Sequence, residues 1–353
     1  MILSRVTKIT TSWSSSWSSY ALNVALLMIF AALYVVVIVQ PKTPVLAIAQ
    51  YPPLYGGILM LLRTFMQPSI ISTVFFAALF ALAPLAAFLL VNSAVKNRIG
   101  GLLAAMLTAF NPALYQLTLP DTHIYALGIV ILPFSIFFLI KTLEKRRVDY
   151  AILATLTGIL LTLASIELVI LYLFVPVSWF IISAAIISFR AKKPLLQRIF
   201  TNTQPTDLPK LTVPLLTVIV STLILTSNFW VSNPFMPLIL LLLITGYLGA
   251  VSLFTRGMFI HFTVFVAWIM FVFQPFLSMA GTTPVFWNTP FITTFPLILL
   301  TASASVILWK QPVTLKKEKV SGEHALLNID LPSITIQLLV TAILILSLLE
   351  LFS

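Results

Sequence analysis

Runs of about twenty apolar residues recur from one end of this sequence to the other, and they constrain its fold more than any other feature. Each run is long enough to cross, as a helix, a hydrocarbon core about 30 Å thick. Composition agrees, because 60% of the 353 residues are hydrophobic and 8% are charged, whereas soluble domains carry about 25% charged residues. The sequence predicts an all-α, polytopic helix bundle in the cell (plasma) membrane, in contact with the lipid bilayer.

We predict about eleven transmembrane helices. The first follows Arg5 and Lys8 but is about twice as long as the apolar region of a signal peptide, so we interpret it as an uncleaved span. Pro112 and Pro133 are expected to kink the spans that contain them. The approximate ranges are 20–39, 71–92, 99–117, 123–141, 150–165, 167–189, 211–231, 235–254, 258–279, 289–309 and 332–351.

The lysines and arginines predict the orientation of these spans. With the N-terminus in the cytoplasm, all of the 20 Lys and Arg residues except Lys42 and Arg63 fall on the cytoplasmic side. Such asymmetry is typical of inner loops. The same rule divides the long apolar run 150–189 into a hairpin that turns near Glu167, which keeps the basic cluster after it inside. The C-terminus is then expected outside.

The predicted organisation has four parts. Residues 1–19 form a cytoplasmic N-terminal segment, 20–189 a first membrane half, 190–210 a cytoplasmic basic loop, and 211–353 a second membrane half. No interruption between spans has the pattern of a soluble domain. The net charge of +11 is distributed in short clusters between spans, which fits a topology signal, and nucleic acid is therefore not an expected partner.

Cofactor and metal chemistry finds little support in the sequence. Cysteine is absent, which excludes disulfides, thiolate metal sites and iron–sulfur clusters. The three histidines are His123, His261 and His324. A transmembrane b haem usually takes two imidazoles at matching depth, and no two of these histidines are expected to meet. We therefore expect neither haem nor a bound metal ion in this chain.

Ionisable residues within membrane spans usually indicate function, because an uncompensated charge there costs at least about 2.5 kcal/mol. Such residues are nearly missing here, since Glu167 falls at an outer turn and Glu350 near the outer end of the last span. The neutral Asn111, Gln116 and Gln274 are interpreted as hydrogen-bonding groups between helices. A transporter or channel consequently remains a minor alternative.

The order of features over residues 51–175 resembles the lipid-dependent glycosyltransferases of the GT-C class. The stretch "YPPLYGGILMLLR" (residues 51–63) is similar to the aromatic-Pro-Leu-Tyr sequence that opens a short apolar helix in that class. The stretches "GGLLAAMLTAFNPALYQL" and "PDTHIYALGIVILPFSIFFLIKTLEKRR" follow in the order of the family's later helices. The resemblance implies a related membrane fold and an enzyme that uses a polyprenyl-phosphate sugar on the extracytoplasmic face.

The catalytic acid that this family carries in its first outer loop has no counterpart here, because residues 40–57 contain no Asp, Glu or His. If the chain is an enzyme, the resemblance leaves Asp121, His123 and Glu167 as catalytic candidates and Arg63 as a phosphate contact. Each has a structural alternative: Asp121 can cap the fourth span, and Arg63 can snorkel to the interface.

The preferred hypothesis is a non-catalytic membrane subunit or anchor that holds partner proteins. In general character the chain resembles the hydrophobic companion subunits of archaeal respiratory cytochrome complexes, which cross the membrane many times, carry no haem ligands and accompany a b-type cytochrome in electron transport. This resemblance implies membrane or cell-surface partner subunits, with the haem held by the partner. The GT-C-like glycosyltransferase is the alternative.

Overall fold

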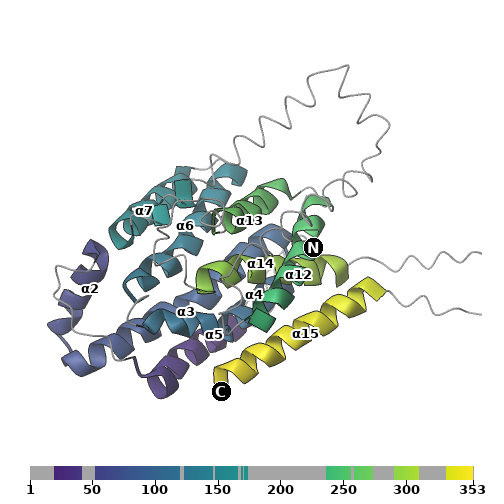
Figure 1. Cartoon of the computed structure of the whole chain (residues 1–353). Coiled ribbons are helices and arrows are strands. Elements are labelled where there is room, and N and C mark those ends of the chain that lie inside the picture. The colour runs from purple at the N-terminus through teal and green to yellow at the C-terminus, as the bar shows by residue number, and fades with distance from the viewer. Residues whose placement is uncertain are drawn as a thin grey trace, which may run out of the picture.

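The computed structural model describes residues 20–41, 52–119, 123–145, 148–165, 168–169, 171–173, 236–255, 258–272, 290–309 and 331–352. Every regular element in these ranges is a helix (Figure 1), which confirms the predicted all-α class. The first helix covers residues 20–39 and ends in a π-helical turn, η1 (Val35–Val39). The others are α2 (Pro53–Arg63), α3 (Pro68–Val95), α4 (Arg98–Ala109), α5 (Pro112–Tyr115), η3 (Gln116–Thr118), η4 (His123–Tyr125), α6 (Ala126–Lys145), α7 (Val148–Ala164), α12 (Met236–Thr255), α13 (Phe259–Val272), α14 (Pro290–Trp309) and α15 (Leu331–Phe352).

Three described helices are long and apolar enough to cross a membrane: Tyr20–Val39, Ile70–Val95 and Ala126–Lys145, with 20, 26 and 20 residues. A helix of twenty residues rises by about 30 Å, the thickness of the hydrocarbon core. Several shorter apolar helices accompany them, among them Val148–Ala164 and Ile336–Phe352. The fold is therefore that of a membrane protein. Predicted span 211–231 and most of span 167–189 lie outside the described residues.

One predicted span is interrupted. The sequence predicts a span over 99–117 with a kink at Pro112. In the structure α4 ends at Ala109 and a separate short helix, α5, begins at Pro112. Asn111 between them is extended (φ −75°, ψ 112°), and its side-chain oxygen accepts a hydrogen bond from the backbone N–H of Ala113 at 3.1 Å. The kink expected at Pro112 is thus a full break between two helices, because the residue before a proline disfavours the helical conformation and Asn is a good N-cap.

A tight turn connects α3 to α4. Lys96 ends α3 in the left-handed region (φ 51°), and the side chain of Asn97 accepts a hydrogen bond from the N–H of Ile99 at 2.8 Å. The helices then pack closely, since a Cβ atom added at Gly101 would lie 2.9 Å from the carbonyl oxygen of Phe88. The turn carries two cations, Lys96 and Arg98, to one end of the bundle.

The α12–α14 interface is closer still. An ideal Cβ at Gly249 of α12 would lie 2.0 Å from the carbonyl oxygen of Leu300 in α14. One turn away along α12, the hydroxyls of Thr245 and Thr301 lie 2.6 Å apart and share a hydrogen bond. Small residues and hydroxyl pairs at a helix interface are typical of membrane bundles, where dispersion and hydrogen bonds replace the hydrophobic effect.

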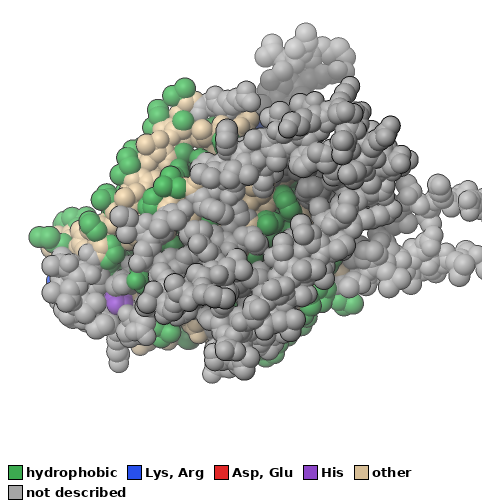
Figure 2. Space-filling view, turned by 45° about the horizontal axis from the view of Figure 1, so that its top comes forward, with side chains coloured by type: hydrophobic (Ala, Val, Ile, Leu, Met, Phe, Trp, Pro, Cys, Tyr) green, Lys and Arg blue, Asp and Glu red, His purple; other side chains and the backbone are tan. Residues whose placement is uncertain are grey.

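Residues from both halves of the chain share one buried cluster, in which Phe76 and Leu90 of α3 join Phe265 of α13 and Phe295 of α14. The first and last described helices also meet, because the hydroxyl of Tyr34 donates a hydrogen bond to the carbonyl of Leu351. Many apolar side chains remain on the outside of the bundle, including those of α7 and α15. Figure 2 shows hydrophobic side chains spread over the described part of one such face.

Candidate functional site

Of the four residues that the sequence suggested for an outer-face active site, the structure describes His123 and Arg63. Asp121 and Glu167 lie outside the described residues. His123 begins η4 and is 1% exposed. Its ring meets that of Tyr55 from α2 edge to face, with 6.3 Å between the ring centroids. Tyr55 in turn packs edge-on against Phe75 of α3 at 4.8 Å. His123 thus belongs to an aromatic contact that joins three segments.

Arg63 is separated from this contact. It is the exposed last residue of α2, eight residues beyond Tyr55, which corresponds to about 12 Å along a helix axis. The cavity described beside α2 has a volume of about 290 Å³ and a fully apolar lining that includes Pro53, Ile58 and Leu163. The structure therefore does not bring Arg63 and His123 together into one polar site.

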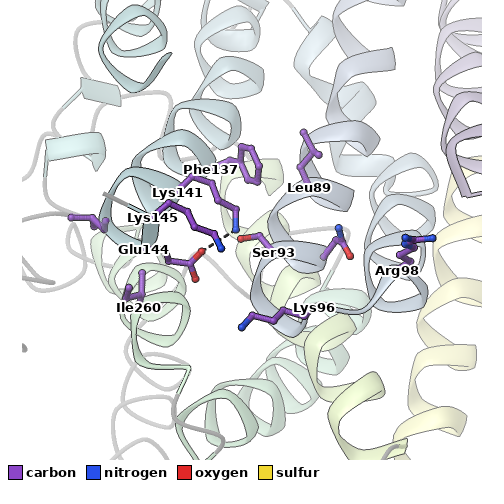
Figure 3. A pocket seen from close by; sticks show the side chains of 11 residues that line it. Leu89, Ser93, Lys96, Arg98, Phe137, Lys141, Glu144, Lys145 and Ile260 are labelled. Carbon is purple, nitrogen blue, oxygen red and sulfur yellow. Dashed lines mark hydrogen bonds and ion pairs between the residues drawn. The ribbon is translucent and has the colours of Figure 1, made fainter. Parts of the chain in front are cut away.

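A larger cavity, lined by both charged and apolar side chains, lies elsewhere, between the ends of α3, α6 and α13. Its volume is about 970 Å³. Figure 3 shows Lys141, Glu144 and Lys145 reaching from α6 towards Ser93 on α3, with Lys96 just after α3 and Arg98 on α4, its guanidinium directed away from Glu144. Apolar side chains complete the wall. The lining residues are Leu89, Asn92, Ser93, Lys96, Arg98, Phe137, Lys141, Leu143, Glu144, Lys145 and Ile260.

Ionic and ring contacts hold two of the lining cations. The ammonium group of Lys141 lies 2.9 Å from Oε2 of Glu144, one helical turn further along α6, and 5.8 Å from the ring centroid of Phe137. The guanidinium of Arg98 lies 5.7 Å from the ring centroid of Tyr20 in the first helix. Such contacts restrict long side chains to a few positions.

His261 of α13 lies behind this cavity and is 3% exposed. Its Nε2 atom is 3.2 Å from the hydroxyl oxygen of Ser93, a hydrogen-bond distance. Its Nδ1 atom is 3.7 Å from Oε1 of Glu144. A connected series therefore runs from Ser93 through His261 and Glu144 to Lys141, and it joins α3, α13 and α6 through side chains.

The two described histidines lie at opposite ends of α6. His123 immediately precedes this 20-residue helix, and His261 approaches Glu144 near its last residue. A helix of that length rises by about 30 Å, so the two rings cannot ligate one haem. Within the described part of the chain, no three His, Cys, Asp or Glu side chains gather as a metal site would require.

The sequence did not predict this cavity, although it does place several of the lining residues on one side of the membrane. The charge rule places Lys96, Arg98, Lys141 and Lys145 on the same, cytoplasmic side of the membrane. Glu144 sits within the same basic segment. The sequence did not indicate that these residues converge, because convergence depends on how α3, α6 and α13 pack.

Buried polar side chains deeper in the bundle pair across helices. The amide nitrogen of Asn111 donates a hydrogen bond to the hydroxyl of Thr294 in α14 at 2.8 Å, and Thr245 pairs with Thr301. The interpretation of Asn111 as a hydrogen-bonding group between helices is confirmed.

The fold and its polar groups define an all-helical membrane protein with a basic cavity at one end. No family model matches the chain, and neither a curated protein nor a solved structure matches it. Its function is therefore argued from its own residues.

Proposed function

We propose that this protein is a non-catalytic, hydrophobic integral subunit of a membrane protein complex, which anchors partner proteins in the bilayer and binds no haem itself. We further propose that it is a multi-pass protein of the plasma membrane with about eleven spans, its N-terminus in the cytoplasm and its C-terminus outside. The apolar helices and the distribution of lysines and arginines support this topology.

The observation that carries the proposal is that three pairs of buried polar side chains bond to one another across helices. Asn111 bonds to Thr294, Thr245 to Thr301, and Ser93 to His261. Each pair joins two different helices, as is typical of polar residues that stabilise a membrane bundle. Polar groups that bond to one another in this way are not available to a transported ion or a substrate. They therefore favour a scaffold over a transport pathway or a catalytic site.

A respiratory cytochrome complex is the setting that we propose for such a subunit, with a b-type cytochrome as the partner. The support is general: a strongly apolar chain, no cysteine, and described histidines too far apart to hold one haem. In this arrangement the partner contributes the redox group, and this chain contributes membrane attachment and contact surface.

The GT-C-like glycosyltransferase remains the second candidate, because one observation favours it. The stretch from Pro53 does form the short apolar helix that the resemblance implies, α2 (Pro53–Arg63). Against it, Arg63 and His123 do not share a site. An active site on that face would have to be built around Asp121 and Glu167.

One purification distinguishes the two functions. The full chain with an affinity tag is solubilised from its native membranes in a mild detergent, and the eluate is analysed by size-exclusion chromatography, mass spectrometry and visible absorption. We expect a stoichiometric partner with a reduced b-type haem band in the same peak. The same preparation is assayed with a polyprenyl-phosphate sugar. Sugar transfer that disappears in Asp121→Ala, from a chain that elutes alone, would overturn the subunit proposal.

A further inference from the structure

We propose that the cavity between α3, α6 and α13 is a binding site for a phosphate group, presented either by an anionic lipid headgroup or by a soluble phosphate compound. The proposal does not depend on the subunit function above, because it requires no partner protein and no reaction. It rests on the charge of the cavity, its position on the helices, its mixed lining and the fixed geometry of its cations.

Charge is the first argument. Among the described residues, Lys96, Lys141 and Lys145 line the cavity together with one carboxylate, that of Glu144, while the guanidinium of Arg98 at its edge lies over the ring of Tyr20. Three cations facing one space repel one another unless an anion compensates them. One carboxylate compensates one of them, so the cavity keeps a positive excess that suits a ligand with one or two negative charges. Lysine and arginine are the side chains that bind phosphate oxygens.

Position along the helices is the second argument. The apolar segment of α3, Ile70–Val95, has 26 residues and rises by about 39 Å, more than the hydrocarbon core of about 30 Å. Lys96 follows its last residue, and Lys145 is the last residue of α6. Both cations therefore stand where headgroup phosphates lie. Basic pockets between membrane helices on the cytoplasmic side commonly take anionic headgroups.

The lining is amphipathic, which is the third argument. Leu89, Phe137, Leu143 and Ile260 contribute apolar surface to the same cavity as the lysines. A volume of about 970 Å³ exceeds what one phosphate ion needs. It has room for a phosphate together with the polar and apolar groups attached to it, as in a lipid headgroup with the first carbons of its chains or in a phosphorylated metabolite.

The fixed position of Lys141 is the fourth argument. Glu144 holds its ammonium group at 2.9 Å, and Glu144 itself lies 3.7 Å from Nδ1 of the buried His261. Ser93 fixes that ring from α3 at 3.2 Å. The cation is thus positioned by side chains of three helices before any ligand arrives, so less conformational entropy is lost on binding.

The test uses the full chain, purified in an uncharged detergent and freed of lipid. Binding of phosphatidylglycerol and of phosphatidylcholine with the same acyl chains is measured by native mass spectrometry. Inorganic phosphate is then added as a soluble competitor. Two variants are compared whose affinities for phosphatidylglycerol should change in opposite directions. One is the double variant Lys96→Gln/Lys145→Gln, which leaves the Lys141–Glu144 pair in place. The other is Glu144→Gln. Lys145→Arg, which keeps the charge, is the matched control.

We expect phosphatidylglycerol to bind more tightly than phosphatidylcholine. Each lysine near a bound anionic lipid contributes roughly fivefold in affinity, so the double variant should bind about 25-fold more weakly. Glu144→Gln should bind more tightly by up to roughly fivefold, because the amide oxygen of the isosteric glutamine can still accept a hydrogen bond from Lys141 while the competing negative charge is removed. Misfolding would not produce that gain. Lys145→Arg should stay within about twofold of the wild type.

Inorganic phosphate separates the two sources of the ligand. If millimolar phosphate leaves the lipid in place, the site takes a headgroup; if phosphate displaces the lipid, the site takes a soluble phosphate compound. Either result supports the proposal. It is overturned if wild-type protein neither prefers phosphatidylglycerol nor binds phosphate. It is also overturned if the double variant keeps full affinity, or if a monodisperse Glu144→Gln protein binds more weakly.

Discussion

Among the described glycines, Gly249 leaves the least space for a side chain, and its replacement by alanine tests the packing directly. The added methyl carbon would lie 2.0 Å from the carbonyl oxygen, 2.5 Å from the carbonyl carbon and 3.0 Å from the Cα atom of Leu300. All three are backbone atoms, so no side-chain rotation relieves the overlap. The axes of α12 and α14 would have to separate by about 1.4 Å to restore an ordinary contact of 3.4 Å.

The expected cost follows from two effects. Overpacking of this kind typically costs about 1–3 kcal/mol. Separation of the helices also weakens the hydrogen bond between Thr245 and Thr301, one turn away, and such bonds contribute about 0.6 kcal/mol in membrane bundles. Alanine recovers up to about 1 kcal/mol over glycine through helix propensity. We therefore expect Gly249→Ala to lower the free energy of unfolding by about 1–3 kcal/mol.

The chain offers two graded controls. At Gly246 the added carbon would lie 3.2 Å from Cδ2 of Leu297, the end of a flexible side chain, and at Gly57 it would meet nothing within 4 Å. Gly246→Ala should change stability by less than about 1 kcal/mol, and Gly57→Ala in α2 should gain up to about 1 kcal/mol.

The assay is equilibrium unfolding by SDS in mixed micelles, followed by tryptophan fluorescence, with helix content from circular dichroism as a second signal. The required order of stability is Gly57→Ala, then Gly246→Ala, then Gly249→Ala as the least stable. A Gly249→Ala protein as stable as Gly57→Ala would refute the described approach of α12 to α14.

Two further predictions use the same SDS titration, and a third uses membrane vesicles. Asn111→Ala removes both the N-cap of α5 and the hydrogen bond to Thr294. It should lower the free energy of unfolding in the SDS titration by about 1–2 kcal/mol, and an unchanged midpoint would contradict the observed contacts. Tyr34→Phe removes the hydrogen bond from the first helix to the carbonyl of α15 and should cost about 1 kcal/mol, with no change in helix content by circular dichroism. Because the chain has no cysteine, a single introduced cysteine reports on which side of the membrane it lies. In right-side-out vesicles an impermeant maleimide should label the Arg63→Cys variant but not the Lys145→Cys variant. The reverse pattern would contradict the proposed orientation.

The helices of this fold are largely predictable from sequence because hydropathy is a local property. Apolar runs long enough to cross the bilayer give the long helices at 20–39 and 126–145 within a few residues. The interruption at Asn111 and Pro112 is also a local effect, and the dipeptide itself predicts it once capping is weighed against hydropathy. The contact of Gly249 with Leu300 is different, because nothing near either residue in the sequence indicates the partner.

The candidate site was less predictable for a related reason. The family resemblance points to the outer loop, because that family carries its catalytic acid there. The basic cavity instead combines residues 89–98, 137–145 and 260–261, and more than a hundred residues separate the second range from the third. The sequence predicts their side of the membrane but not their meeting point, which depends on helix lengths and crossing geometry.

The charge rule that orients membrane proteins explains why lysines gather on one side, and it would be satisfied by cations scattered anywhere on that surface. The rule requires only that Lys141 lie on the cytoplasmic side, whereas its side chain is held at one defined position. Its partner Glu144 adds nothing to a topology signal, which depends on lysines and arginines and little on acidic residues. Glu144 also approaches His261, which a hydrogen bond from a third helix holds in place. A carboxylate, an imidazole and a hydroxyl from three helices are more than orientation demands. Their arrangement is better explained by a requirement to present this cation at a fixed point to an anion.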